Sequence, residues 1–489
     1  MLCLAAAAIS LACRQPKVPE APLTILLPGQ VLSLDPNREM DMITDSVLFN
    51  VFEPLVGIDD KLRIRMMLAE SWENPRPEQW RFHLRRNVRF HDGTPLTASL
   101  VRDVCLEVRR SPEFEASNFL TPVEDIVVID EHTLDFITHR PRLLLTNLTT
   151  VYVTKRSAGE GFPPLVGTGP YQIREWSPST RVELARYAGY WGAPPEFGEV
   201  GFESVPDAGQ REARLVAGKA DIIFRAPHTL AARVAPGVRF VHRKGVAVFY
   251  LGVNLRKRQG HSLDDLRVRR ALHLGLDREA LVRQFLHGLG SVATQPIPPD
   301  VFGYNPQLPE PRRDLVQARK LLEEAGQIRG LSVRLDLDPP QLEAGRIIER
   351  SLAEIGVRVE LNVVTHEEVY SLAQAGKSDL SFMGWVFSSG EAGEFYEFCL
   401  HTPGTGYGFN NYGGYSSAPL DAIAESNGLI LQPRGRRDGL WKAAALAMEE
   451  LPVIPLYVPD DTWGVSDRVR FKPRADNELW LPDVLKNEP

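Results

Sequence analysis

The stretch WRFHLRRNVRFHDGTPLTASLVRDV, residues 80–104, contains in succession a strand pattern, a turn signal and a helix start. Apolar and polar residues alternate over residues 80–84, the two-residue period of a half-buried strand. Asp92-Gly93 is a strong turn signal, and Thr97 stands where a helix N-cap is expected, ahead of apolar residues at helical spacing. We therefore predict a strand, a turn and a capped helix here.

The same stretch places His91 beside Asp92, a pair that could suggest acid/base chemistry or a metal site. Adjacent residues on an extended strand point to opposite faces, so the two side chains are poorly arranged to share one proton or one metal ion. We interpret the pair as the corner of a turn and expect no catalysis there.

The 489-residue chain is 43% hydrophobic and 24% charged, so it can bury a substantial core. At usual domain sizes it forms two or three domains. Its formal net charge of −7 leaves no basic surplus to neutralise a phosphate backbone, and no Lys/Arg stripe with interleaved aromatic residues stands out. Nucleic acid is therefore excluded as an expected partner.

Residues 1–12 contain an apolar run too short to span a bilayer as a helix, followed by a polar segment with prolines. This pattern is typical of an export signal. The tetrad Ser10 to Cys13 resembles a bacterial lipobox, so we expect cleavage after residue 12, lipid on Cys13 and a linker over residues 13–21. An ordinary secretory signal with an incidental cysteine is the alternative.

No later apolar run is long enough for a membrane helix. We therefore expect the mature body in the periplasm or on the cell surface, attached to the membrane by the lipid on Cys13.

Once Cys3 is removed and Cys13 is acylated, only Cys105 and Cys399 remain, which implies no disulfide framework and no cysteine metal site. The sequence has no G-x-S-x-G, P-loop or H-E-x-x-H pattern, and its 11 histidines are scattered. We expect no catalytic residue, no metal site and no cofactor. A hydrolase using His91 and Asp92 is the enzymatic alternative.

Helices alternate with short apolar strands in the second half of the chain. The helix pattern of residues 314–326 is followed by the strand pattern LSVRLDLD (331–338), and the helix pattern of 346–356 by VRVELNVV (357–364). This order predicts an α/β fold built on a sheet.

Several short motifs, each weak alone, follow one another in a fixed order along the chain. Together with residues 80–104 they resemble the extracytoplasmic solute-binding proteins of ABC importers, family 5, the oligopeptide/dipeptide/nickel-binding type. The motifs are SLDP (33–36), GTGPYQI (167–173), ARYAGYWG (185–192) and LPVIPLYVP (451–459).

This resemblance implies a periplasmic-binding-protein-like fold (class II, cluster C) with two lobes, a hinge, a ligand cleft and an extra inserted subdomain. Ligand binding in the cleft is expected to favour the closed form, which the permease recognises. By similarity, lobe one comprises residues 22–60, 165–257 and 466–489, the inserted subdomain residues 61–164, and lobe two residues 258–465.

In the peptide-binding relatives, extended peptides are held largely through main-chain hydrogen bonds, and an aspartate after a tryptophan captures the ligand ammonium. Trp385 takes the place of that tryptophan, but Ser388 stands where the aspartate is expected, and Phe382 occurs where some relatives have arginine. A serine cannot neutralise a cation. Either Glu391 or Glu394 supplies the charge from a shifted loop, or the ligand is not a peptide with a free amino group.

The resemblance places further ligand-binding candidates at Gln30, Val31, Glu367 and Tyr457, besides Trp385 and Ser388. Each has a structural alternative: strand core for Val31, an acid at a helix start for Glu367, and a half-buried side chain for Tyr457.

We expect the protein to be a monomer that captures peptides or peptide-like solutes and delivers them to a cognate ABC permease with its ATPase. A non-peptide solute, either an oligosaccharide or a metal chelate, is the alternative within the family. A ligand-sensing module that is not coupled to transport is the alternative from another class.

Radioactive fatty acid supplied to a bacterial host that expresses the chain is expected to label the mature protein at Cys13. Absence of label would remove the lipid anchor and favour the ordinary secretory signal.

Overall fold

The structure is a computed structural model that describes residues 21–38, 41–157, 162, 164–232, 236–256, 262–327, 330–404 and 406–487. The expected signal of residues 1–12 and the lipid site at Cys13 lie outside the described residues.

A 12-stranded sheet runs through the molecule. In sheet order its strands are β12 (Tyr171–Ser177), β13 (Arg181–Arg186), β14 (Glu199–Ser204), β1 (Leu23–Leu27), β15 (Ile222–Phe224), β22 (Val453–Ser466), β17 (Ala247–Val253), β21 (Leu380–Val386), β19 (Leu331–Leu337) and β20 (Val357–Val363). Two more strands, β16 (Val238–Lys244) and β18 (Gly290–Val292), also pair with β22.

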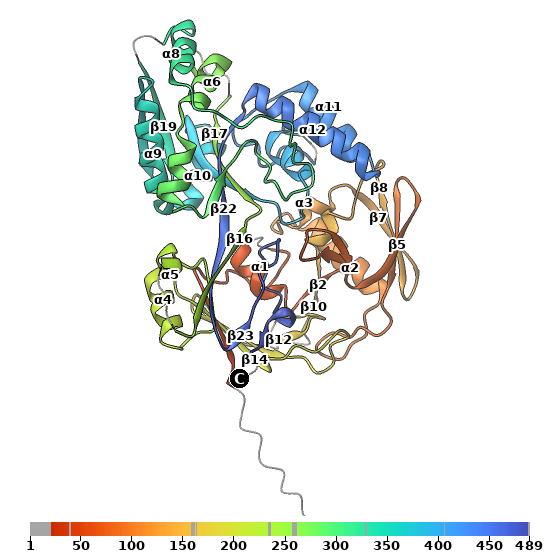
Figure 1. Cartoon of the computed structure of the whole chain (residues 1–489). Coiled ribbons are helices and arrows are strands. Elements are labelled where there is room, and N and C mark those ends of the chain that lie inside the picture. The colour runs from red at the N-terminus through yellow and green to blue at the C-terminus, as the bar shows by residue number, and fades with distance from the viewer. Residues whose placement is uncertain are drawn as a thin grey trace, which may run out of the picture.

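The long strand β22 belongs to both halves of this sheet (Figure 1). Its residues 460–466 pair with β16, and its residues 453–457 pair with β17, so residues 238–253 run antiparallel along almost its whole length. The chain thus crosses between the two halves along two neighbouring strands. Both ends of β22 are buried, whereas residues 459–462 in its middle are partly exposed.

Gly245 lies where these two crossings approach each other, between β16 and β17. A Cβ atom on Gly245 would lie 2.5 Å from the carbonyl oxygen of Pro459. Only glycine therefore fits this contact without moving the backbone.

Each half of the sheet has its own apolar core. On the first side Ile25, Phe202 and Trp463 are buried together, and on the second side Leu335 and Leu456 belong to a separate cluster. Helices α4 (Ala208–Val216) and α5 (His228–Ala232) lie on the first half; α6 (Leu266–Gly275), α8 (Leu315–Glu324), α9 (Leu342–Ala353) and α10 (His366–Gln374) lie on the second (Figure 1). This two-lobe α/β arrangement is the fold class that the sequence predicts.

A separate four-stranded sheet forms the right-hand part of Figure 1, in the order β5 (Ala69–Arg76), β6 (Gln79–Leu84), β8 (Thr133–Thr138), β7 (Val123–Asp130). Helix α2 (Ala98–Arg110) covers it. Its core residues Trp80 and Phe136 belong to the same buried cluster as Phe395 and Leu440 of the second half. The four-stranded sheet with α2 and the segment up to residue 146, called the inserted unit below, is therefore joined to the second half by continuous apolar packing.

The opening stretch folds as its sequence predicts: β6 ends at Leu84, Gly93 has φ +83°, and α2 begins after Thr97, whose hydroxyl accepts from the Leu100 amide at 3.3 Å. His91 lies 3.1 Å from the Gly169 carbonyl through Nε2, whereas Asp92 pairs with Lys155. The two side chains thus contact different neighbours, which agrees with the interpretation of the pair as the corner of a turn.

The remaining α-helices and β-strands of the described part of the chain lie outside these two sheets. They are α1 (Met42–Leu48), β2 (Glu53–Pro54), β3 (Val56–Ile58), β4 (Ile64–Met66), α3 (Ser117–Leu120), β9 (Tyr152–Val153), β10 (Lys155–Arg156), β11 (Leu165–Val166), α7 (Arg278–Ala280), α11 (Ala418–Gly428), α12 (Pro433–Glu450), β23 (Val469–Arg470) and β24 (Leu485–Lys486). None of the helices in the described ranges combines the length and apolar composition that a membrane span needs.

Cys105 and Cys399 are both buried free thiols. They form no disulfide with each other. Burial raises the pKa of the Cys105 thiol to about 12.

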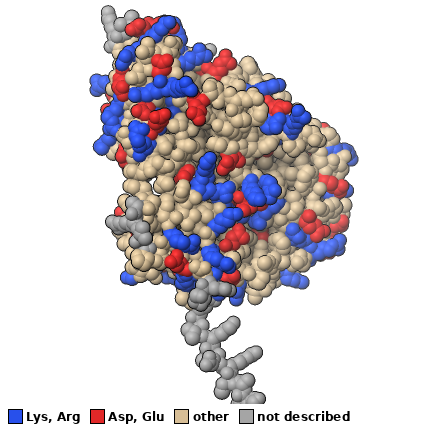
Figure 2. All heavy atoms as spheres, in the orientation of Figure 1, with Lys and Arg blue, Asp and Glu red and all other residues tan. Residues whose placement is uncertain are grey.

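On the face in Figure 2, acidic and basic side chains are interspersed over all parts of the molecule. That face offers no uniformly basic surface of the kind a phosphate backbone requires.

Asn50 joins the C-terminal segment to the end of α1. Its amide nitrogen donates to the carbonyls of Ser46 (3.0 Å) and Leu479 (2.8 Å), and its amide oxygen accepts from the Leu481 amide (2.8 Å). Asn50 is fully buried.

We expect Asn50→Ala to lower the free energy of unfolding by about 2–4 kcal/mol, because buried backbone groups of Leu479 and Leu481 lose their partners. Urea unfolding measures this. The control Asn118→Ala, which removes one exposed local bond to the Glu115 carbonyl, should cost less than about 1 kcal/mol. Equal losses in both variants would contradict this role.

Candidate ligand-binding cleft

A cavity of about 240 Å³ opens at the middle of β22, where the two halves of the sheet meet. Phe249, Val386 and Tyr457 line it from the second half, and Arg225 and Asp461 from the first. A solute in this cavity would touch both halves at once.

Tyr457 forms part of the apolar wall of this cavity. Its ring is 1% exposed and stacks on Phe249 with 5.2 Å between ring centroids, and Phe285 lies 5.8 Å away. The hydroxyl donates to Gln341 Oε1 at 3.2 Å. Both Gln341 and the ring line the cavity, so Tyr457 offers aromatic surface to a ligand while its hydroxyl stays paired.

The opposite wall is charged. Burial raises the pKa of Asp461 to about 7, Arg225 lowers it, and the adjacent Asp460 raises it. Asp460 Oδ2 itself lies 2.8 Å from His242 Nδ1. The cavity therefore combines an aromatic wall with a carboxyl group that changes charge near neutral pH.

A second cavity of about 50 Å³ lies close to the first. Ser388, in the segment after β21, lines it together with Asp45 of α1, Asp476 and Glu478. Asn477 Nδ2 lies 3.1 Å from Met42 Sδ, and this contact borders the larger cavity. Asn477 lines the larger cavity and its sequence neighbours Asp476 and Glu478 line the smaller one, so both cavities border the same C-terminal segment and form one cleft.

Of the six predicted ligand-binding residues, the structure brings Tyr457 and Ser388 to these cavities. Trp385 lies shortly before Ser388 in the sequence, is half-buried, and packs against Phe395 with 6.1 Å between ring centroids. Its indole Nε1 is buried without a hydrogen-bond partner in the described part of the chain.

The other predicted residues lie elsewhere. Gln30 is exposed after β1, and Val31 is 7% exposed and packs into the core of the first half beside Trp176. Glu367 is exposed in the first turn of α10. Neither cavity is lined by any of these three side chains.

The two glutamates considered as substitute charges are both buried inside the protein. Glu391 forms a buried ion pair with Arg436. Glu394 is 8% exposed, and burial raises its pKa to about 8. Phe382 is 5% exposed in the core of the second half. None of the three lines either cavity.

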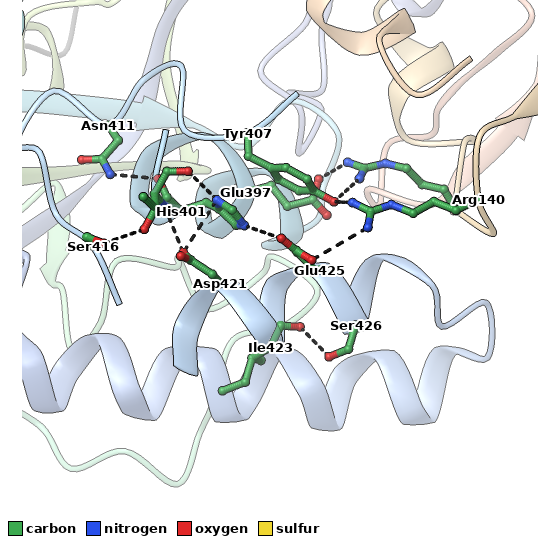
Figure 3. A network of polar contacts seen from close by, with 12 residues as sticks. Arg140, Glu397, His401, Tyr407, Asn411, Ser416, Asp421, Ile423, Glu425 and Ser426 are labelled. Atoms are coloured by element: carbon green, nitrogen blue, oxygen red, sulfur yellow. Dashed lines mark hydrogen bonds and ion pairs between the residues drawn. The ribbon is translucent and has the colours of Figure 1, made fainter. Parts of the chain in front are cut away.

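A polar network joins the inserted unit to the second half (Figure 3). Arg142 forms a buried ion pair with Glu397 and donates to the Tyr407 hydroxyl at 3.1 Å. Arg140 also donates to this hydroxyl, at 2.5 Å, and lies 3.8 Å from Glu425. Breaking a buried ion pair is costly, so this contact adds to the apolar packing between the two units.

Sequence reasoning missed Asp45, Asp461, Glu478 and Arg225 as cleft residues. None of these four residues belongs to a short sequence motif that indicates a binding role. They meet only because β22 and the C-terminal segment return to the N-terminal half. No group of three or more His, Cys, Asp or Glu side chains arranged for a metal ion occurs in the described ranges.

The family of bacterial extracellular solute-binding proteins, family 5 Middle, matches residues 63–407 of this chain. The chain belongs to this family.

Similarity to individual members extends over most of the molecule. The dipeptide-binding protein of Escherichia coli (strain K12) is 25% identical over 429 residues, which cover 78% of each chain. Helicobacter pylori DppA in complex with the peptide STSA has a TM-score of 0.83 at 19% identity, covering 96% of this chain and 98% of that one. NikA from Brucella suis in complex with Fe(III)-EDTA has a TM-score of 0.84 at 18% identity, covering 96% and 100%. The two structures share the fold of this family 5 protein.

The raised pKa of Asp461 predicts a pH dependence of stability. Its folded pKa, about 7, exceeds its ordinary value of 3.8, so the folded state binds the proton more tightly. This group's contribution to stability is therefore lost as pH rises from about 4 to 7.

We expect Asp461→Asn to lose less stability than the wild type between pH 4 and pH 8, as measured by urea unfolding at four pH values. Asp300→Asn, an exposed control, should follow the wild-type curve. Parallel curves of stability against pH for wild type and Asp461→Asn would contradict the raised pKa of Asp461.

Proposed function

We propose that this family 5 protein captures peptides or peptide-like solutes outside the cytoplasmic membrane and delivers them to a cognate ABC permease with its ATPase. The observation that carries the proposal is the cavity at the middle of β22, lined from both halves of the sheet. A solute that contacts both walls stabilises the closed form over the open one, and this difference in affinity drives closure.

The names of the relatives support peptide-like solutes. A dipeptide-binding protein and several glutathione-binding proteins match more than two thirds of the chain. A mixed cavity with an aromatic wall and a carboxyl group suits small zwitterionic molecules of this kind.

We assign residues 22–60, 165–257 and 466–489 to lobe one, 61–164 to an inserted subdomain and 258–465 to lobe two. We place the hinge at residues 244–246 and 459–462, where the two crossing strands pass from one half of the sheet to the other, and this moves the lobe boundaries from residues 257 and 465 to these positions. The Gly245 contact with Pro459 keeps the crossings in register during closure.

The protein acts as a monomer tethered through lipid on Cys13. A tether keeps the binding protein near the membrane that holds the permease. Stable anchoring generally needs two membrane-binding groups, and the acylated N-terminus of a lipoprotein carries more than one acyl chain.

A second candidate is a non-peptide solute such as an oligosaccharide or metal chelate. The observation that favours it is Ser388, which lines the cleft where the peptide-binding relatives carry the ammonium-binding aspartate. The Fe(III)-EDTA complex of the Brucella suis NikA is one case of a chelate on this fold.

Native mass spectrometry of gently purified protein is expected to detect a co-purified small solute, and small-angle scattering to show a smaller radius when the solute is present. Val386→Trp, which fills the cavity from an exposed strand end, should weaken binding of this solute by at least about tenfold, or 1.4 kcal/mol.

Val363→Trp is the matched control, because Val363 is similarly exposed (43% against 39% for Val386) at the end of β20 in the same sheet and lines neither cavity. Unchanged binding in Val386→Trp would place the solute elsewhere. Absence of any bound solute and of any size change would count against solute capture altogether.

A further inference from the structure

The smaller cavity of the cleft is walled by carboxyl groups from the first half and by Ser388 from the second. Asp45 projects from α1, whose N-cap is Asp41. Glu478 lies in the C-terminal segment that Asn50 holds against the end of α1. Both carboxyl groups are thus fixed by buried backbone contacts and not by mobile surface loops.

Neither Asp45 nor Glu478 has an ion pair within the described residues. The nearby cation Arg474 is committed to Asp476, to which its Nε donates at 3.0 Å, and to the carbonyl of Ile58 at 2.8 Å. A second nearby cation, Arg65, lies over the ring of Trp480 at 5.2 Å, and the lining of the pocket itself contains three acidic side chains and no basic one.

Polar groups that face the pocket are also without hydrogen-bond partners. Tyr152 is 8% exposed and lines the pocket, and its hydroxyl makes no hydrogen bond to any described residue. Glu478 Oε2 is buried and likewise unpartnered. The Ser388 hydroxyl is a third uncommitted group on the opposite wall. Buried polar groups normally find partners, so the Tyr152 hydroxyl and Glu478 Oε2 are open to a polar group of a bound solute.

We propose that this pocket is the subsite for a primary ammonium group of the solute, with Asp45 and Glu478 supplying the negative charge and Ser388 and Tyr152 accepting hydrogen bonds. The inference rests on the proposed solute capture and specifies its ligand as a cationic one. The charge that is absent at position 388 thereby comes from the opposite lobe.

The size of the pocket fits such a group. Its volume of about 50 Å³ exceeds the roughly 10–15 Å³ that one water molecule needs, and an ammonium group is of similar size to water. An ammonium brings three donors, which matches a wall of uncommitted acceptors.

The direction of the pKa shifts in the pocket is consistent with this assignment. Burial raises the pKa values of Asp45 and Glu478, and each is further raised by neighbouring acids: Asp41 and Glu115 for Asp45, and Asp45 and Asp476 for Glu478. Arg474 lowers the pKa of Glu478. Burial and the same carboxylates also raise the pKa of Tyr152. A bound cation relieves this repulsion.

Calorimetry with trialanine and N-acetyl-trialanine tests the inference, because acetylation removes the ammonium and leaves the rest of the peptide. We expect wild-type protein to bind trialanine at least about 100-fold more tightly than its acetylated form. Glu478→Gln and Asp45→Asn should each reduce this ratio at least about tenfold by weakening trialanine alone.

Glu349→Gln, an exposed acid on α9, is the charge-matched control and should leave the ratio unchanged. The two pocket replacements keep side-chain shape and remove like-charge repulsion, so their urea midpoints should not fall below that of the wild type. A lower midpoint would itself show that these carboxylates pair inside the protein and would overturn the assignment.

Equal binding of both peptides would overturn the ammonium subsite and leave solute capture intact. If neither peptide binds, the chemistry of the co-purified solute tests the subsite. A solute without a basic nitrogen overturns the subsite. A solute with a basic nitrogen supports it if the Glu478→Gln variant no longer binds that solute. No binding by either peptide and no co-purified solute would overturn the proposed function and the subsite with it.

Discussion

Backbone pairing along β22 holds the two halves of the molecule together, since residues 453–457 bond to β17 and residues 460–466 to β16. Both ends of β22 are buried in the cores of the two halves, and residues 459–462 between them are the part of the strand that is partly exposed. The cleft therefore lies where β22 passes from one core to the other. Asp461 belongs to this partly exposed stretch and Tyr457 lies just before it, and both line the cavity.

The buried acidic side chains of the described residues differ in their partners. Glu397 pairs with Arg142 and Glu391 with Arg436, and neither ion pair lines a cavity of the cleft. Within the cleft, Asp476 pairs with Arg474, whereas Asp45 and Glu478 have no ion pair in the described part of the chain. Because an unpaired buried charge is destabilising, these two acids distinguish the cleft from the structural ion pairs around it.

Local patterns in the sequence were sufficient for the elements of residues 80–104, since strand alternation, the Asp92-Gly93 turn and the Thr97 cap are all short-range effects. The succession of short motifs along the chain was sufficient to predict the family. The cleft could be predicted only in part: Tyr457 and Ser388 lie in it, whereas Asp45 and Glu478 were missed. Those two meet through contacts of Asn50 with Leu479 and Leu481, more than 400 residues away in the chain, and no local pattern encodes such a pairing.

The two native thiols of the described chain, Cys105 and Cys399, are 2% and 7% exposed, and burial raises the pKa of each. Thiolate is the reactive form, so both should resist maleimide dyes at neutral pH. Cysteines introduced at exposed positions on opposite halves, such as Val216 on α4 and Val316 on α8, could then be labelled selectively. The protein is thus already suited to conversion into a fluorescent reporter of the solute that it binds.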